Sequence, residues 1–180
     1  MNSNERQLVL DQLTTSEARL LDLVSNLTPQ QWHFRESPER WSIADNIEHV
    51  ILFENFLKGV ILKTLAEEAQ PEKKPQAAAK EPLVFGIANG RDTKFNAREV
   101  VRPTGKWPDT AEMVAEFQKT RAQTRAFVAE IQGDLRSHFF AHIALGDLDC
   151  YQWLVVMAQH GARHALQIEQ IKADPAYPSA

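Results

Sequence analysis

Four stretches of the chain place apolar residues at the three- and four-residue intervals of an amphipathic helix, with charged and polar residues between them. In the second stretch Ser42 and Asp45 have the spacing of a capping box, and the fourth opens at Asp149 and ends before Pro175. Each stretch is therefore expected to form one long helix that buries its apolar face. The expected helices span residues 4–25, 42–68, 109–131 and 149–173, with ends that are approximate.

The connections between these helices differ in length. Residues 135–146 have no clean period, so we expect them to form an irregular joint. Residues 69–108 form a long connection that is charged and rich in proline at its start, with a turn predicted at Asn89-Gly90. A connection of that length is unusual in a compact domain unless it is functional or packs on the helices, so we expect it to cover one end of the functional site.

The number and order of these elements predict an all-α fold. No period of about 20 to 50 residues repeats along the chain, which argues against a solenoid. Four long helices with one long connection favour a four-helix bundle with a long crossover between the second and third helices. The 180 residues, 43% of them hydrophobic, are enough to bury a core, and we expect residues 1–180 to form a single domain.

Composition and charge argue against several classes of function. Lys and Arg total 20 and Asp and Glu total 24, a net charge of −4 without long blocks of either sign, so nucleic acid is not an expected partner. The N-terminal residues do not resemble a signal peptide, and no apolar run approaches the ~18 residues of a membrane span. The single cysteine, Cys150, excludes an internal disulfide and fits a reducing compartment. We expect a cytoplasmic protein.

Three histidines are candidates for one metal site. His160 and His164 are four residues apart, so their side chains lie on the same face of the fourth helix, on the apolar stripe that includes Trp153. His49 also faces inward, on a stripe of the second helix with Phe53. Burying unpaired imidazoles is costly, and a zinc-type catalytic site uses three protein ligands and one open position. The alternative is that they are core histidines satisfied by hydrogen bonds.

Partners for these imidazoles are harder to identify. Asp45 is one turn before His49 and could accept its second N–H, or could serve only in the helix cap. Gln167 is close in projection to His164 and is a second candidate. Glu48 projects about 100° away from its neighbour His49, so the sequence identifies no general base and no catalytic side chain.

The remaining histidines and the cysteine have weaker claims to a role. His33 is interpreted as a surface or joint residue, and His138 has no supporting context. His142 lies near the start of the fourth helix and could line the mouth of the site or only pack. The helix N-terminus at Cys150 would lower the pKa of its thiol, but at least two turns separate it from His160, so no role is expected for it.

Three segments resemble those of the DinB-like, or YfiT-like, superfamily of metal-dependent four-helix-bundle proteins. They are WSIADNIEH at 41–49, the Leu145-Gly146-Asp147 turn, and HGARHALQI at 160–168. The resemblance covers nearly the whole chain, and residues 69–108 match poorly. It implies a metal triad at His49, His160 and His164, commonly with zinc or nickel, and often a homodimer. Relatives include thiol-dependent transferases and isomerases.

The leading hypothesis is a metal-dependent enzyme that acts on a small molecule. With bound water, a divalent metal ion at the triad would support a hydrolase, and with a low-molecular-weight thiol it would support a thiol transferase. The sequence does not distinguish between these two reactions. The alternative is a non-catalytic helical bundle that binds a metal or a ligand.

Overall fold

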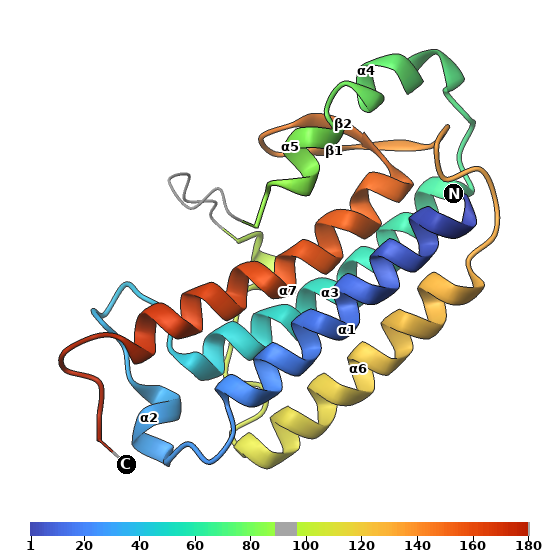
Figure 1. Ribbon diagram of the computed structural model, residues 1–180. Helices are drawn as coiled ribbons and strands as arrows, with labels where there is room; N and C mark the ends of the chain where they lie inside the picture. Colours follow the sequence, from blue (N-terminus) through green and yellow to red (C-terminus); the bar gives the residue numbers. More distant parts are fainter. Residues whose placement is uncertain (89–96, 180) are drawn as a thin grey trace.

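Four long helices run side by side along one axis of the molecule (Figure 1). The computed structural model describes residues 1–88 and 97–179, so the turn predicted at Asn89-Gly90 lies outside the described residues. The prediction of an all-α four-helix bundle with a long crossover between the second and third long helices is confirmed. The long helices are α1 (Ser3–Leu23), α3 (Ile43–Leu65), α6 (Thr110–Glu130) and α7 (Cys150–Lys172).

The helix starts follow from local capping. The Ser42 hydroxyl accepts from the Asp45 amide at 3.2 Å, while the Asp45 carboxylate accepts from the Ser42 amide at 2.7 Å, which closes the capping box of α3. Asp149 and Gln152 cap α7 in the same reciprocal way. These interactions satisfy amides that have no partner within the first turn, so they define where each helix begins.

The helices pack in a ring in which α1 and α3 each contact both α6 and α7. Two apolar clusters fill the interior, one around Leu57 and Leu154 and the other around Ile47 and Ile168. Each of the four long helices also buries polar side chains. They include Ser16 of α1, His49 and Glu54 of α3, Thr120, Arg121 and Thr124 of α6, and His164 of α7.

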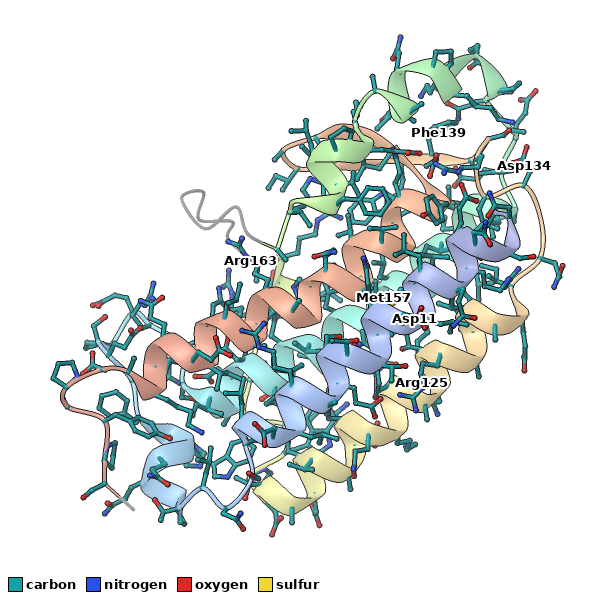
Figure 2. All side chains as sticks on the ribbon, in the orientation of Figure 1. Asp11, Arg125, Asp134, Phe139, Met157 and Arg163 are labelled. Carbon is teal, nitrogen blue, oxygen red and sulfur yellow. The ribbon has the colours of Figure 1, made fainter. Side chains whose placement is uncertain are left out.

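The crossover between α3 and α6 packs on the bundle. It contains η1 (Pro71–Lys73), α4 (Lys74–Ala78), α5 (Glu81–Phe85) and η2 (Glu99–Val101). Helix α5 contacts α7 and η2 contacts α3, and Arg163, on the side of α7 that faces the crossover (Figure 2), donates to the Ile87 carbonyl at 3.5 Å. The short helix α2 (Pro29–His33) joins α1 to α3.

The prediction of an irregular joint at 135–146 is wrong in part. The strands β1 (Phe139–His142) and β2 (Gly146–Asp149) pair as an antiparallel hairpin, with Gly146 at a positive φ of 64° in its turn. Trp153 donates to the Phe140 carbonyl at 3.0 Å and joins the hairpin to α7. Four residues are the shortest run in which alternation can be read, and the first strand, with Phe139 next to Phe140, does not alternate.

Within the described residues, no helix has both the length and the apolar character needed to cross a membrane.

Candidate metal centre

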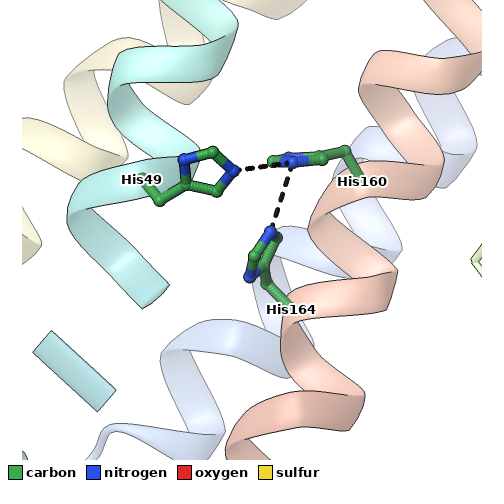
Figure 3. A group of neighbouring side chains, drawn as sticks. All are labelled: His49, His160 and His164. Atoms are coloured by element: carbon green, nitrogen blue, oxygen red, sulfur yellow. Dashed lines mark hydrogen bonds between the residues drawn. The ribbon is translucent and has the colours of Figure 1, made fainter. Parts of the chain in front are cut away.

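Three imidazoles from two helices meet inside the bundle (Figure 3). The Nε2 atom of His160 lies 3.1 Å from that of His49 and 3.2 Å from that of His164. His49 and His164 are buried, with 5% and 3% of their surface exposed. Among residues 1–88 and 97–179, these three histidines are the set of at least three His, Cys, Asp or Glu side chains that lie close enough together to hold one metal ion.

Hydrogen bonds fix the tautomers of two of these histidines. The Nδ1 atom of His49 lies 2.6 Å from the Val101 carbonyl, which can only accept, so Nδ1 carries the proton. The Nδ1 atom of His164 lies 2.7 Å from Asn46 Oδ1, and Asn46 Nδ2 donates to the Ser42 carbonyl, which sets the orientation of the amide. In both residues the Nε2 lone pair is therefore directed toward the third histidine.

His160 cannot satisfy this arrangement with hydrogen bonds. Its Nδ1 atom is buried and has no hydrogen-bond partner among the described residues. If Nδ1 carries the proton, three Nε2 lone pairs converge with no proton between them; if Nε2 carries it, the N–H has two acceptors and Nδ1 stays empty. Each unsatisfied buried group costs about 1–3 kcal/mol. A cation that accepts all three lone pairs would remove the conflict.

The two distances between His160 and the other imidazoles fit a zinc-type site. Zinc–imidazole bonds are about 2.0–2.1 Å long. Two ligands at about 2.1 Å from one ion lie about 3.4 Å apart at the tetrahedral angle and about 3.0 Å apart at a right angle. The two separations that involve His160, 3.1 and 3.2 Å, lie between these values, and the three ligand atoms all lie within 4.8 Å of one another. Imidazole donors suit zinc, nickel, copper and iron.

Burial keeps the three imidazoles neutral. It lowers the pKa of His49 from its ordinary 6.5 to about 4, against the opposing effect of the Val101 hydrogen bond. The pKa values of His160 and His164 are held well below that range, first by burial and then by the neighbouring positive charges, which include Arg163. Neutral imidazole is the form that binds metal, so the centre is ready for it at neutral pH.

Aromatic side chains hold the imidazole rings. Phe53 stacks on His160 with ring centroids 3.9 Å apart and an angle of 18° between the planes. Trp41 packs 4.7 Å from His49 and lies nearly parallel to His164, with centroids 6.1 Å apart. Because these rings restrict imidazole rotation, the nitrogen positions are set before any ligand arrives.

A cavity of about 750 Å³ opens beside the three histidines. Its apolar wall includes Phe53, Phe140 and Trp153, and the crossover contributes Arg98 and Arg102. The volume is in the range of small-molecule sites. The crossover therefore covers the site, as its length predicts.

Of the two side chains predicted to bond the imidazoles, Asp45 does not do so and Gln167 lies beside His164. Asp45 does not contact His49: its carboxylate completes the cap at Ser42 and pairs with Arg35 at 2.7 Å. Gln167 lines the cavity, and its side chain acts to raise the pKa of His164. The hydrogen-bond acceptors in place at the three histidines are the Val101 carbonyl and Asn46 Oδ1, neither of which was predicted from the sequence.

One signal for Asn46 was present in the sequence. It lies three residues before His49 and so shares the same face of the helix. The histidine that Asn46 bonds, however, is His164 on α7 and not His49 on its own helix.

The other histidines lie outside the cluster. His33 ends α2 and is exposed, as expected, and His138 bonds the Thr64 carbonyl through Nδ1 at 3.2 Å. His142 lines the cavity, and its Nδ1 accepts from the amides of Ala144 and Leu145. Lining the site and packing were the two roles that the sequence left open for His142, and in the structure the residue does both.

The expectation that the helix N-terminus lowers the pKa of the Cys150 thiol is wrong. Burial, helped by the nearby carboxylates of Asp149 and Glu67, raises the pKa of Cys150 to about 12. Desolvation therefore outweighs the helix N-terminus, which alone would have lowered the pKa. The thiol is free and buried, so it stays protonated at neutral pH.

Comparison with known proteins identifies related chains. A model of the DinB superfamily matches residues 12–168, which include all three histidines of the cluster. The uncharacterized protein YuaE of Bacillus subtilis (strain 168) is 25% identical over 163 residues, which cover 87% of this chain and 94% of YuaE.

A solved structure has the same fold. YfiT from Bacillus subtilis, described as a probable metal-dependent hydrolase with an unusual four-helix bundle topology, superposes with a TM-score of 0.66 at 13% identity. The match covers 96% of this chain and 88% of YfiT. At this identity the likeness concerns the fold, and a shared activity does not follow from it.

Proposed function

The chain belongs to the DinB superfamily, and from that premise we propose that it is a metal-dependent enzyme in which His49, His160 and His164 hold a divalent ion beside a small-molecule cavity. The observation that supports this most strongly is the convergence of three Nε2 atoms at a point where no arrangement of protons satisfies them. Zinc and nickel are the proposed metals, in keeping with the all-imidazole donor set.

The chain's own residues would orient and enclose a reaction at this centre. Val101 and Asn46 hold the ligand tautomers, while Phe53 and Trp153 offer an apolar surface that excludes water from a bound substrate. Arg98 could pair with an anionic group of that substrate. When bound, a divalent ion would supply Lewis acidity and lower the pKa of water or of a thiol in an open position.

Hydrolysis and thiol transfer are both proposed reactions. The likeness to YfiT, described as a probable metal-dependent hydrolase, supports the first. The second rests on the family resemblance, whose members include thiol-dependent transferases. Asp45 and Glu48, the carboxylates nearest to His49 in sequence, are both engaged in hydrogen bonds, so neither is free to act as a general base for either reaction. A low-molecular-weight thiol with a lowered pKa reaches its nucleophilic form without such a base.

Metal analysis of protein purified without an affinity tag tests the proposal. We expect about one equivalent of metal in the wild type and in the matched control His33→Ala, and loss of that metal in His160→Ala. Metal content that is equal in all three proteins would contradict the proposed site.

Activity distinguishes an enzyme from a binding protein. Metal-loaded protein would be assayed with a panel of esters and amides, and with electrophiles in the presence and absence of low-molecular-weight thiols. Turnover that disappears in His160→Ala would support an enzyme. Stoichiometric metal without turnover of any substrate would favour the alternative, a non-catalytic metal- or ligand-binding bundle.

Self-association is part of the proposal. We propose a homodimer from the family resemblance. Light scattering that gives only a 20.4 kDa species would contradict it.

A further inference from the structure

Glu48, the residue immediately before His49, is buried with 1% of its surface exposed. Its Oε1 accepts from the Thr104 amide at 2.8 Å, the Thr104 hydroxyl at 3.2 Å and the Lys106 amide at 3.3 Å. Its Oε2 accepts from the Gly105 amide at 3.0 Å. One carboxylate thus receives four hydrogen bonds, and all of them come from the crossover.

The crossover is shaped to surround this carboxylate. Gly105 has a φ of +74°, a left-handed conformation that other residues adopt only with strain. Consecutive amides with a left-handed residue among them can turn toward one anion. Bonds of this kind to a charged acceptor are stronger than neutral ones, so Glu48 fixes the position of this part of the crossover.

The same part of the crossover carries the acceptor for a metal ligand. Val101 lies three residues before Thr104, and its carbonyl is 2.6 Å from His49 Nδ1. Two adjacent residues of α3 therefore bind the crossover at two points. The Glu48 contacts hold the segment, and the His49 contact uses it to keep the proton on Nδ1 and leave Nε2 free.

We propose that Glu48 is a positioning residue that couples docking of the crossover to metal affinity, a role that rests on the proposed metal site. Without these contacts the Val101 carbonyl moves. The neutral His49 ring is then free to rotate, or to carry its proton on Nε2, the atom that must bind the ion, instead of on Nδ1. Hydrogen-bond partners of metal-binding histidines typically contribute about 10–100-fold in affinity. By linkage, bound metal stabilises the docked crossover by the same factor.

A matched variant separates this coupling from general stability. Asp45 lies three residues before Glu48 on α3, and its carboxylate also accepts from a backbone amide, that of Ser42. Its bonds belong to the helix cap and to Arg35, and none of them is to the crossover. Zinc affinity would be measured by competition with a chelator for the wild type, Glu48→Gln and Asp45→Asn. We expect Glu48→Gln to lose about 10–100-fold and Asp45→Asn less than about threefold, whatever each does to the melting temperature.

Two results would overturn the coupling alone: equal zinc affinity in Glu48→Gln and the wild type, or an equal loss in Asp45→Asn. Failure of the wild type to bind zinc would instead overturn the proposed function, and the coupling with it.

Hydrogen exchange in the wild type gives a test that does not depend on a variant folding. The amides of Thr104, Gly105 and Lys106 are expected to exchange more slowly when zinc is added, while amides at the start of α1 do not change. Unchanged exchange at all three positions in the zinc-loaded protein would overturn the proposal.

Discussion

Gly161 lies in α7 between His160 and His164, and replacing it with Ala is expected to destabilise the protein. A Cβ atom there would lie 2.9 Å from the guanidinium of Arg121 and 3.1 Å from the hydroxyl of Ser16. Arg121 is fully buried and pairs with the equally buried Glu54 at 2.8 Å, so it cannot move into solvent. The missing side chain of Gly161 is what allows this ion pair to pack against α7.

The magnitude follows from two opposing effects. Ala is favoured over Gly in a helix interior by about 1 kcal/mol. Overpacking a core costs about 1–3 kcal/mol, and breaking a buried ion pair costs about 3–5 kcal/mol. Because the Ala side chain would displace Arg121 without removing it, we expect an overpacking cost in the upper part of its range, about 2–3 kcal/mol. Less the gain of about 1 kcal/mol from Ala, Gly161→Ala should lower the free energy of unfolding by about 1–2 kcal/mol.

Gly59 of α3 is the matched control, since it lies inside a long helix and a Cβ there meets nothing within 4 Å. Gly59→Ala is expected to raise the free energy of unfolding by about 1 kcal/mol. Urea unfolding of both variants gives the comparison. If Gly161→Ala stabilised the protein as much as Gly59→Ala, the packing of Arg121 against α7 would be refuted.

Three further predictions concern the centre and the buried polar side chains beside it. Asn46→Ala should weaken zinc binding about 10-fold or more, because His164 loses the acceptor that fixes its tautomer; chelator competition measures this. Arg121→Met should cost about 3–5 kcal/mol by leaving Glu54 unpaired, and adding Glu54→Leu should recover most of the loss in urea unfolding. Metal-free protein should lose stability as pH falls from 6.5 to 4, because the unfolded chain binds protons there that buried His49 does not, and a urea titration showing no loss would contradict this.

The helices and the three histidines that meet between them could be predicted because their signals are local. Ser42 and Asp45 mark the start of α3 by spacing alone, and the interval between His160 and His164 places both imidazoles on one face. The inward direction of His49 follows from its apolar stripe. Periodicity thus supplied the three candidate ligands, but not the distances between them.

The contacts that tune the centre could not be predicted, because they depend on tertiary structure. The Val101 carbonyl is a backbone group 52 residues from His49, in a segment without periodicity, and a sequence does not specify which carbonyl docks there. Glu48 was interpreted only as a side chain directed away from His49, and its partners come from the same distant segment. The thiol of Cys150 was misjudged because burial is also a tertiary property.

The central claim is that the three imidazoles hold one metal ion. A crystal structure of the zinc-loaded protein, with anomalous diffraction measured at the zinc edge, tests it most directly. We expect the strongest anomalous peak at about 2.0–2.1 Å from the Nε2 atoms of His49, His160 and His164. A strongest peak elsewhere, with no peak between these three atoms, would contradict the account.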